Sequence, residues 1–339
     1  MKKELMYLQN TTCSLYLPFQ LFKANILINR YSFGCENTSI DQGRSYENMN
    51  INISDCYFSR SSTYSGYGGT IYVSSGSLSM RVDRSMFYNC VCSSDGGAIW
   101  FSSSNSELRM ICANRCSCGI NSNGHFALLL ASQENLVEFI SVSFCSHETN
   151  GYYSIRLRTG NQKVDNSNSS MNKANRDSGI GIGSPSFTSS YCTFSNNNVS
   201  SRICIFFYSN SGTMSYANIV NNNSPINYGV VSVEGTESTK MMYCVFKDNQ
   251  NTLFCLLAGP LEVSHSYIYH TGGFSTSTSV SSNNNNSLTA FKTYQIPFFN
   301  SLHCNADVPH IVNNQVNTID QKHMRSCQFI YLTLILVSF

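Results

Sequence analysis

Five cysteines fall within residues 90–118 of this 339-residue chain, and this group of thiols is the feature closest to a metal site. Four thiolates can hold Zn²⁺ in a tetrahedral site. The spacings are Cys-x-Cys and Cys-x3-Cys, however, without the paired Cys-x2-Cys of zinc knuckles, and no histidine stands at ligand spacing. We therefore expect no metal and no cofactor, and keep as a weak candidate cluster Cys90, Cys92, Cys112, Cys116 and Cys118.

The charged residues do not form a catalytic pattern. A glycoside hydrolase needs two carboxylates about 5 to 9 Å apart, whereas the acidic residues here are scattered singly along the chain. The segment Arg156-Leu157-Arg158 places two arginines on one face of a strand, where we expect a solvated surface. The histidines form no triad-like set, and only His147 falls at a repeated corner. We predict that the chain is not an enzyme and nominate no catalytic residue.

The composition indicates an all-β protein with few charges. Charged residues make up 12% of the chain, compared with about 25% in an average globular protein. The net charge of +2 predicts no nucleic-acid partner. Aromatic residues are plentiful, and Gly, Ser and Asn are spread throughout, which is typical of short strands joined by turns.

These strands repeat. The segment YCTFSNNNV (191–199) recurs as YANIVNNNS (216–224) and as YCVFKDNQN (243–251). The position of the phenylalanine in YCTF, called the marker position here, is expected at Phe33, Phe58, Phe87, Ala113, Phe144, Phe194, Ile219, Phe246 and Ile268, with a degenerate copy within 160–178. A second alternation is centred on Ile71, Ile99, Leu128, Ile155, Gly181, Ile205, Val231 and Leu256. A third and weaker alternation keeps the same period.

Three short strands in each unit of roughly 26 residues predict a single-stranded right-handed parallel β-helix of about nine or ten coils. A propeller blade would need four strands in a longer repeat. Successive coils would lie ~4.8 Å apart. The asparagines after the marker would then form a ladder at one corner, an arrangement that is structural rather than ligand-binding. Cys56, Cys192, Cys204, Cys244 and Cys255 would be buried thiols, with disulfides as the alternative.

Short tetrapeptides support a family resemblance. GGTI (68–71) and GGAI (96–99) each follow a marker phenylalanine, and FSNN (194–197) and FKDN (246–249) fit Phe-x-x-Asn. These tetrapeptides resemble the alternating GGA[ILV]/FxxN repeat of the polymorphic outer membrane proteins of chlamydia-type bacteria, and the chain is closer in likeness to related surface families of parasitic protists. The resemblance covers residues 31–270 and gives a structural role to Phe58, Gly68, Gly69, Ile71, Phe87, Gly96, Gly97, Ile99, Phe194, Asn197, Phe246 and Asn249.

The resemblance and the composition divide the chain into five parts. They are an N-terminal segment with a weak signal-like start (1–30), the β-helix (31–270), a Ser/Asn-rich link (271–287), a C-terminal cap or loop (288–322) and an apolar tail (323–339). The stretch CQFIYLTLILVSF (327–339) is shorter than the ~20 residues that span a bilayer. A truncated transmembrane anchor, a lipid-anchor signal and a buried strand remain open for it.

The resemblance implies a non-enzymatic protein at the cell surface or on a membrane, facing outward, of the adhesion or surface-antigen type. Its partner would be a protein or a glycan, and residues 327–339 would associate with a membrane. Two alternatives remain. One is a β-helix polysaccharide lyase or hydrolase, and the other is a diverged or truncated family copy without a binding role of its own.

Overall fold

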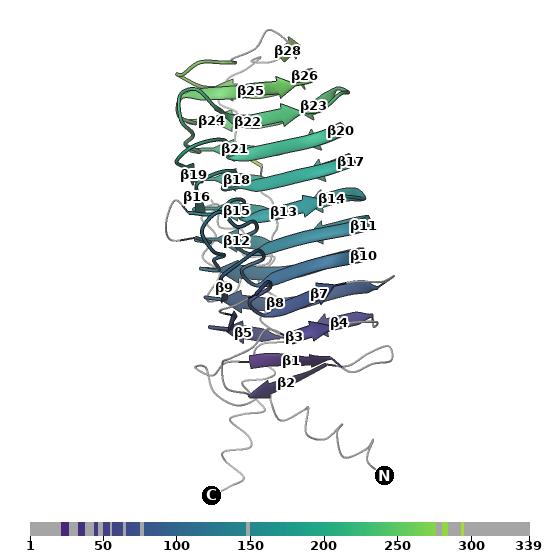
Figure 1. The fold of residues 1–339 in the computed structure, drawn as a ribbon. Helices are drawn as coiled ribbons and strands as arrows, with labels where there is room; N and C mark the ends of the chain where they lie inside the picture. Colours follow the sequence, from purple (N-terminus) through teal and green to yellow (C-terminus); the bar gives the residue numbers. More distant parts are fainter. Residues whose placement is uncertain are drawn as a thin grey trace, which may run out of the picture.

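The computed structural model is a right-handed β-solenoid of about eight turns, with stacked parallel strands about 26 residues apart. It describes residues 22–26, 33–37, 44–46, 50–54, 56–63, 66–74, 78–146, 150–275, 280–283 and 293–294. Figure 1 shows the strands stacked as rungs from β3 to β28, with β1 and β2 at one end. The predicted fold class is confirmed, with about eight turns rather than nine or ten.

Each turn contributes one strand, or one part of a long strand, to each of three parallel sheets. The first sheet contains β3 (Arg44–Tyr46), β7 (Ile71–Ser74), β13 (Ile155–Arg158), β22 (Gly229–Glu234), β25 (Thr252–Ala258) and the beginnings of β10 (Ile99–Asn114), β11 (Ala127–Glu138), β17 (Ile180–Ser190) and β20 (Ile205–Ser215). The second contains the later parts of β11, β17 and β20, the middle of β10, the beginning of β8 (Ser79–Tyr88), and β4 (Ile51–Ser54), β14 (Asn161–Asp165), β23 (Thr239–Met242), β26 (Leu261–Ser264) and β28 (Val280–Asn283).

The third sheet contains the marker positions. It is built from the ends of β8 and β10 and from β5 (Tyr57–Ser59), β12 (Ser141–Ser143), β15 (Asn168–Ser170), β18 (Thr193–Ser195), β21 (Asn218–Val220), β24 (Val245–Lys247) and β27 (Tyr267–Tyr269). Two short pairs complete the solenoid, β6 (Ser62–Thr63) with β9 (Val91–Cys92) and β16 (Lys173–Ala174) with β19 (Asn198–Val199).

The marker residues stack in one column inside the solenoid. Cα pairing links Phe58, Phe87, Ala113, Val142, Ser169, Phe194, Ile219, Phe246 and Ile268 in that order. The Phe58 and Phe87 rings are stacked with centroids 4.8 Å apart, which is the spacing of neighbouring strands. The degenerate copy predicted within 160–178 is therefore Ser169.

Two predicted marker positions are wrong. Val142, not Phe144, pairs with Ala113, and Phe144 has a φ of 53° and points outward with 37% of its surface exposed. Phe33 lies in β2 (Phe33–Asn37), which pairs antiparallel with β1 (Phe22–Ile26), and the parallel stacking begins at β3. At Phe144, an aromatic residue near the expected spacing was mistaken for an inward-facing one.

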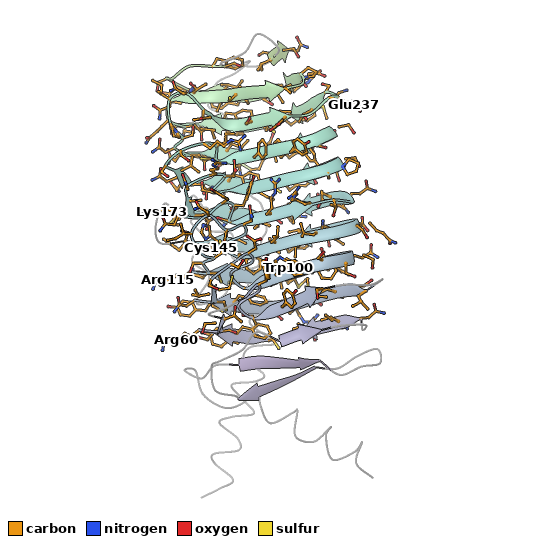
Figure 2. The ribbon with its side chains drawn as sticks, in the orientation of Figure 1. Arg60, Trp100, Arg115, Cys145, Lys173 and Glu237 are labelled. Atoms are coloured by element: carbon orange, nitrogen blue, oxygen red, sulfur yellow. The ribbon has the colours of Figure 1, made fainter. Side chains whose placement is uncertain are left out.

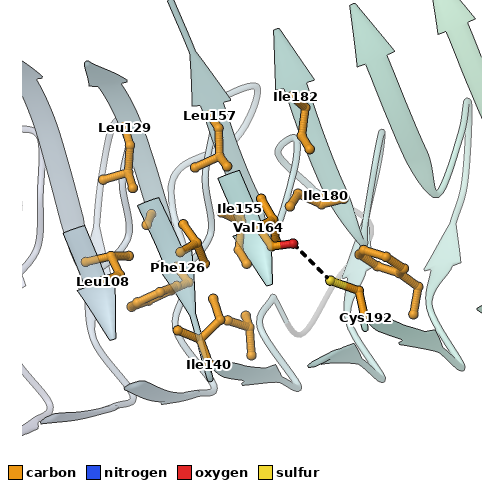
Figure 3. Close-up of a cluster of buried hydrophobic side chains, with 14 of the residues drawn as sticks. Leu108, Phe126, Leu129, Ile140, Ile155, Leu157, Val164, Ile180, Ile182 and Cys192 are labelled. Atoms are coloured by element: carbon orange, nitrogen blue, oxygen red, sulfur yellow. Dashed lines mark hydrogen bonds between the residues drawn. The ribbon is translucent and has the colours of Figure 1, made fainter. Parts of the chain in front are cut away.

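Some predicted centres of the second alternation also differ from the residues that point into the core. Its inward column is Ile71, Ile99, Ala127, Ile155, Ile180, Ile205, Val231 and Phe254. The predicted centres Leu128 and Gly181 are one residue away from it, and so face outward. Figure 3 shows part of the core, where Leu129, Leu157 and Ile182 of successive turns lie beside each other.

Paired glycines precede the first sheet in two turns, as predicted. Gly68 has a φ of 61° and Gly96 one of 73°, the left-handed region that glycine adopts without strain. A Cβ on Gly69 would lie 2.2 Å from the Gly97 carbonyl oxygen. Each pair therefore allows two neighbouring turns to approach closely before Ile71 and Ile99 enter the core.

Several predictions concern the ends of the chain, which lie mostly outside the described residues. The apolar tail 323–339 lies outside the described residues, as do most of segments 1–30 and 288–322. Residues 280–283, inside the predicted link, form β28 against β26. Within the described part of the chain we find no helix that is both long and apolar enough to cross a bilayer.

Candidate functional site

Each turn bends sharply just before the third sheet, at a residue with left-handed backbone. The residues at this corner have φ between 43° and 56°, and they are Arg84, Met110, Phe139, Asn166, Tyr191, Tyr216, Tyr243 and His265. Most are neither glycine nor asparagine, so the conformation is imposed by the hydrogen-bonded strands on either side rather than by local preference. The bend turns the side chain away from the core.

Three consecutive turns place tyrosine at this corner. The Tyr191 and Tyr216 rings are stacked with centroids 5.0 Å apart and an interplanar angle of 6°, and Tyr216 and Tyr243 are stacked at 5.1 Å and 9°. His265 continues the row, 5.3 Å from Tyr243. Tyr191 is 44% exposed and Tyr243 is 39% exposed. We call Tyr191, Tyr216 and Tyr243 the tyrosine stack.

The geometry of the tyrosine stack determines which ring surface faces a partner. Both faces of Tyr216 are covered by its neighbours, so its edge is the part available on the outside. Ring edges carry the positive part of the aromatic quadrupole, and tyrosine is enriched at protein interfaces because it combines an apolar body with a polar tip. The tyrosine stack is thus a row of ring edges repeating every 5 Å.

A second segment of the chain contacts this surface. The Asn218 side chain, on the outer face of β21 and 2% exposed, donates from Nδ2 to the Tyr294 carbonyl oxygen at 2.9 Å. Its Oδ1 accepts the Tyr294 backbone N–H at 2.9 Å. The Tyr294 ring lies 5.8 Å from Tyr216 at an angle of 82°. Residue 294 is therefore held by its backbone and by its ring.

A buried group of charged and aromatic side chains lies on the outer face of the first sheet. The Arg156 guanidinium lies 4.2 Å from the Tyr153 ring centroid and 5.8 Å from that of Phe206, and Arg202 lies 5.2 Å from Phe206. Asp177 is fully buried beside Tyr153, Arg156 and Arg202. Burial raises the pKa of Asp177 to about 7, although the nearby Arg202 and Arg156 act in the opposite direction.

The interpretation of Arg156 and Arg158 as a solvated pair is wrong for Arg156. Both face outward, but Arg156 is 7% exposed because Tyr153 and Phe206 cover it. Gly181 provides the space, since a Cβ there would lie 2.2 Å from a Tyr153 ring atom and 2.6 Å from Nη1 of Arg156. Arg158 is exposed, as predicted.

The five cysteines of the weak metal candidate are distributed over different faces. Cys90 and Cys116 point into the core, and Cys112 lies on the outer side and is disulfide-bonded. Burial raises the pKa of the Cys92 thiol to about 12, and also raises that of Cys118. Among the described residues no group of three or more His, Cys, Asp or Glu side chains is arranged to hold a metal ion.

The Cys118 thiol instead faces a buried histidine. Its Sγ lies 3.3 Å from His125 Nδ1, which also accepts the Cys118 backbone N–H at 3.2 Å. The His125 proton therefore resides on Nε2. Burial lowers the pKa of His125 to about 4. This imidazole is neutral at physiological pH.

Sequence reasoning missed the tyrosine stack as a site, although its residues start the three copies of the repeat. It also placed His265 outside the repeat, whereas His265 occupies the same corner as Tyr243. The signal that could have found the row was the constant offset of three residues before each marker. The pattern was interpreted only for its buried positions.

A hollow of about 680 Å³ lies elsewhere on the rod, at its C-terminal end. It is open and is lined by Ile226, by residues 248–252 and by residues 271–273. Its lining contains one carboxylate, Asp248, beside amide and backbone groups. The hollow does not include the tyrosine stack or Arg156.

Comparison with known proteins gives no family for the chain: no family model, no curated protein and no solved structure matches it.

Proposed function

We propose that this chain is a non-enzymatic, surface-displayed β-solenoid that binds a partner through the tyrosine stack. The observation that carries the proposal is the row of mutually stacked rings at Tyr191, Tyr216 and Tyr243, of which the two outer rings, Tyr191 and Tyr243, are exposed. The rings of the tyrosine stack point outward, so they do not contribute to the packing of the marker residues or of the rest of the core. Stacking also restricts each ring, so that little side-chain entropy is lost when a partner binds.

The finer family identity is part of the same proposal. Phe194 and Asn197, like Phe246 and Asn249, combine a core ring with a corner amide. This use of Phe-x-x-Asn supports a likeness to the GGA[ILV]/FxxN surface proteins, closer to the protist families than to a bacterial autotransporter. Display at the cell surface, and membrane association through residues 327–339, belong to this proposal.

Two measurements on the full chain test it. Surface biotinylation of intact cells that express the chain is expected to label it. The purified protein is expected to bind saturably to at least one member of a panel of immobilised proteins and glycans. The triple variant Tyr191→Ser, Tyr216→Ser, Tyr243→Ser should then weaken that binding at least tenfold.

The matched control is the double variant Tyr208→Ser, Tyr269→Ser. These tyrosines are each 53% exposed and lie outside the stack, so binding should be retained. Equal loss in both variants, absence of surface labelling, or turnover of any glycan on the panel would contradict the proposal.

A further inference from the structure

We infer that the surface formed by Asn218 and the tyrosine stack is a docking site for an extended peptide that carries an aromatic residue, and that Tyr294 of the same chain occupies it. The inference rests on the proposed function and names its partner class. It depends on the contacts that one peptide unit makes with this surface.

The Asn218 amide recognises backbone rather than a side chain. Its Oδ1 accepts the N–H of residue 294, and one hydrogen of its Nδ2 is donated to the carbonyl oxygen of the same residue. The second Nδ2 hydrogen goes to Thr193 Oγ1 at 3.1 Å. An asparagine amide has two donor hydrogens and an acceptor oxygen, so its donor capacity is fully used. A neighbouring strand would bind the two backbone groups of residue 294 in the same way.

Asn218 allows a peptide backbone to bind at one turn of the rod and not at the turns on either side. In the turn before, the equivalent residue is Thr193, and in the turn after it is Val245. A hydroxyl cannot hold both backbone groups of one residue at this spacing as the amide does, and a valine offers no hydrogen bond. With residue 294 in place Asn218 is 2% exposed, and a buried amide without partners is unfavourable. Its hydrogen bonds to residue 294 are therefore strongly favoured.

The ring contact favours an aromatic partner. The faces of Tyr216 are covered by Tyr191 and Tyr243, so the near-perpendicular contact at 82° brings its edge toward the face of Tyr294. An edge-to-face pair of rings stabilises a contact beyond the area that it buries. A sugar ring packs on an aromatic face, and the faces inside the stack are not available. The surface is thus better matched to a peptide with an aromatic side chain than to a glycan.

Occupation by the chain's own residue has a consequence for binding in trans. An intramolecular ligand competes at an effective concentration in the millimolar range. A peptide from a partner must displace Tyr294 first, so removal of the Tyr294 ring should expose the site. A chain that lacks the Tyr294 ring is therefore expected to bind an added peptide more tightly than the wild-type chain does. If Tyr294 only stabilised the fold, its removal would not tighten the binding of a peptide.

The experiment uses the full chain and a fluorescent synthetic peptide with the sequence of residues 291–297. The Tyr294→Ala chain is expected to bind the peptide saturably, at least tenfold more tightly than the wild-type chain in fluorescence anisotropy. Replacing tyrosine by serine in the peptide should weaken binding at least tenfold. Adding Asn218→Val to the Tyr294→Ala chain should have a similar effect. Tyr269→Ala serves as the control and should bind as the wild type does.

A second measurement separates the docking site from the proposed function. Hydrogen exchange at the Tyr294 amide should be at least tenfold faster in the Asn218→Val chain than in the wild type, with the far-UV circular dichroism spectrum unchanged. If the Tyr294→Ala chain does not bind the peptide, or if the Tyr294 amide exchanges equally fast in both chains, the docking inference is overturned. Loss of partner binding in the triple tyrosine variant would still support the proposed function in that case.

Discussion

The corner after the third sheet carries cysteine in the N-terminal turns and asparagine in the C-terminal turns. Three residues after the markers from Phe87 to Phe246 stand Cys90, Cys116 and Cys145, and then Asn172, Asn197, Asn222 and Asn249. Both kinds of residue point to the marker carbonyl of the preceding turn. Cys116 Sγ lies 3.7 Å from the Phe87 oxygen, and Asn222 Nδ2 lies 2.9 Å from the Phe194 oxygen.

The difference is that asparagine also accepts hydrogen bonds. Asn222 Oδ1 accepts the Asn197 backbone N–H at 3.1 Å and Asn197 Nδ2 at 3.0 Å. At the junction of the two regions, Cys145 donates its backbone N–H to Asn172 Oδ1 at 2.8 Å. A thiol is a weak donor and a weak acceptor. The two regions therefore share one stacking geometry, but at this corner only the C-terminal region joins its turns through side-chain amides.

The largest expected effect comes from breaking the amide ladder in its middle. Asn222→Leu removes the bonds to Phe194, Asn249 and Asn197 and leaves buried polar groups without partners. We expect a loss of about 3–5 kcal/mol in the free energy of unfolding. The matched change Cys116→Ala should cost about 1–2 kcal/mol. Guanidinium denaturation measures both, and equal midpoint shifts would show that the two corners do not differ.

The second effect is a pair of opposite pH responses. His125 has its pKa lowered from 6.5 to about 4, so the unfolded chain binds more protons in that range and stability falls on acidification, by at most about 3 kcal/mol. Asp177 has its pKa raised from 3.8 to about 7, so stability rises as pH falls through that range. Between pH 4 and 6.5 the two contributions oppose each other.

Single variants separate the two responses. We expect His125→Gln to become more stable, and Asp177→Asn to become less stable, when the pH is lowered from 6.5 to 4. Thermal unfolding of each variant at several pH values measures this. Parallel pH profiles in the two variants would refute the assignment.

The third effect tests whether the two corners can be exchanged. Asn197→Cys keeps a donor near the Ser169 carbonyl oxygen but removes the acceptor of the Asn172 N–H, which lies 3.1 Å from Asn197 Oδ1. We expect a loss of about 2 kcal/mol. Cys116→Asn should change stability by at most about 1 kcal/mol, because the amide places donor and acceptor as its equivalents do. Equal losses of stability in the two variants would mean that local packing, and not hydrogen bonding, determines which residue is favourable at each corner.

The smallest effect concerns the outer face of the second sheet. In the N-terminal turns Arg109 lies 3.7 Å from Glu107 and 3.1 Å from Glu138, whereas Ser190 and Ser215 hold the equivalent positions later. We expect Arg109→Gln to cost less than about 1 kcal/mol, because such pairs are partly solvated. The loss should disappear in 1 M NaCl, where charges are screened. A loss independent of salt would instead indicate packing of the arginine stem.

The sequence predicted the buried positions of the solenoid better than its outer ones. Phe58, Phe87, Phe194 and Phe246 share one column because side chains of like type must lie over each other in a stacked core. Outward positions lack that constraint. An outward-facing residue can be covered by a side chain from a neighbouring corner, and the sequence pattern does not show this. Arg156 was therefore expected in solvent, although Tyr153 covers it.

The same limit applies to the candidate site. The tyrosines of the three repeats were visible in the sequence, but their stacking depends on a left-handed corner that no residue type there specifies. The contact between Asn218 and Tyr294 joins positions 76 residues apart. No local pattern predicts such a contact, because Tyr294 belongs to none of the repeated alternations that place the other residues.

The amide ladder bears on how such a rod changes in length over generations. Asn197 and Asn222 are 25 residues apart and make matching bonds on both sides. A duplication or deletion of one complete unit between them would therefore join two ends that already fit. A rod shortened or lengthened by one such unit would keep its corner amides paired across the junction.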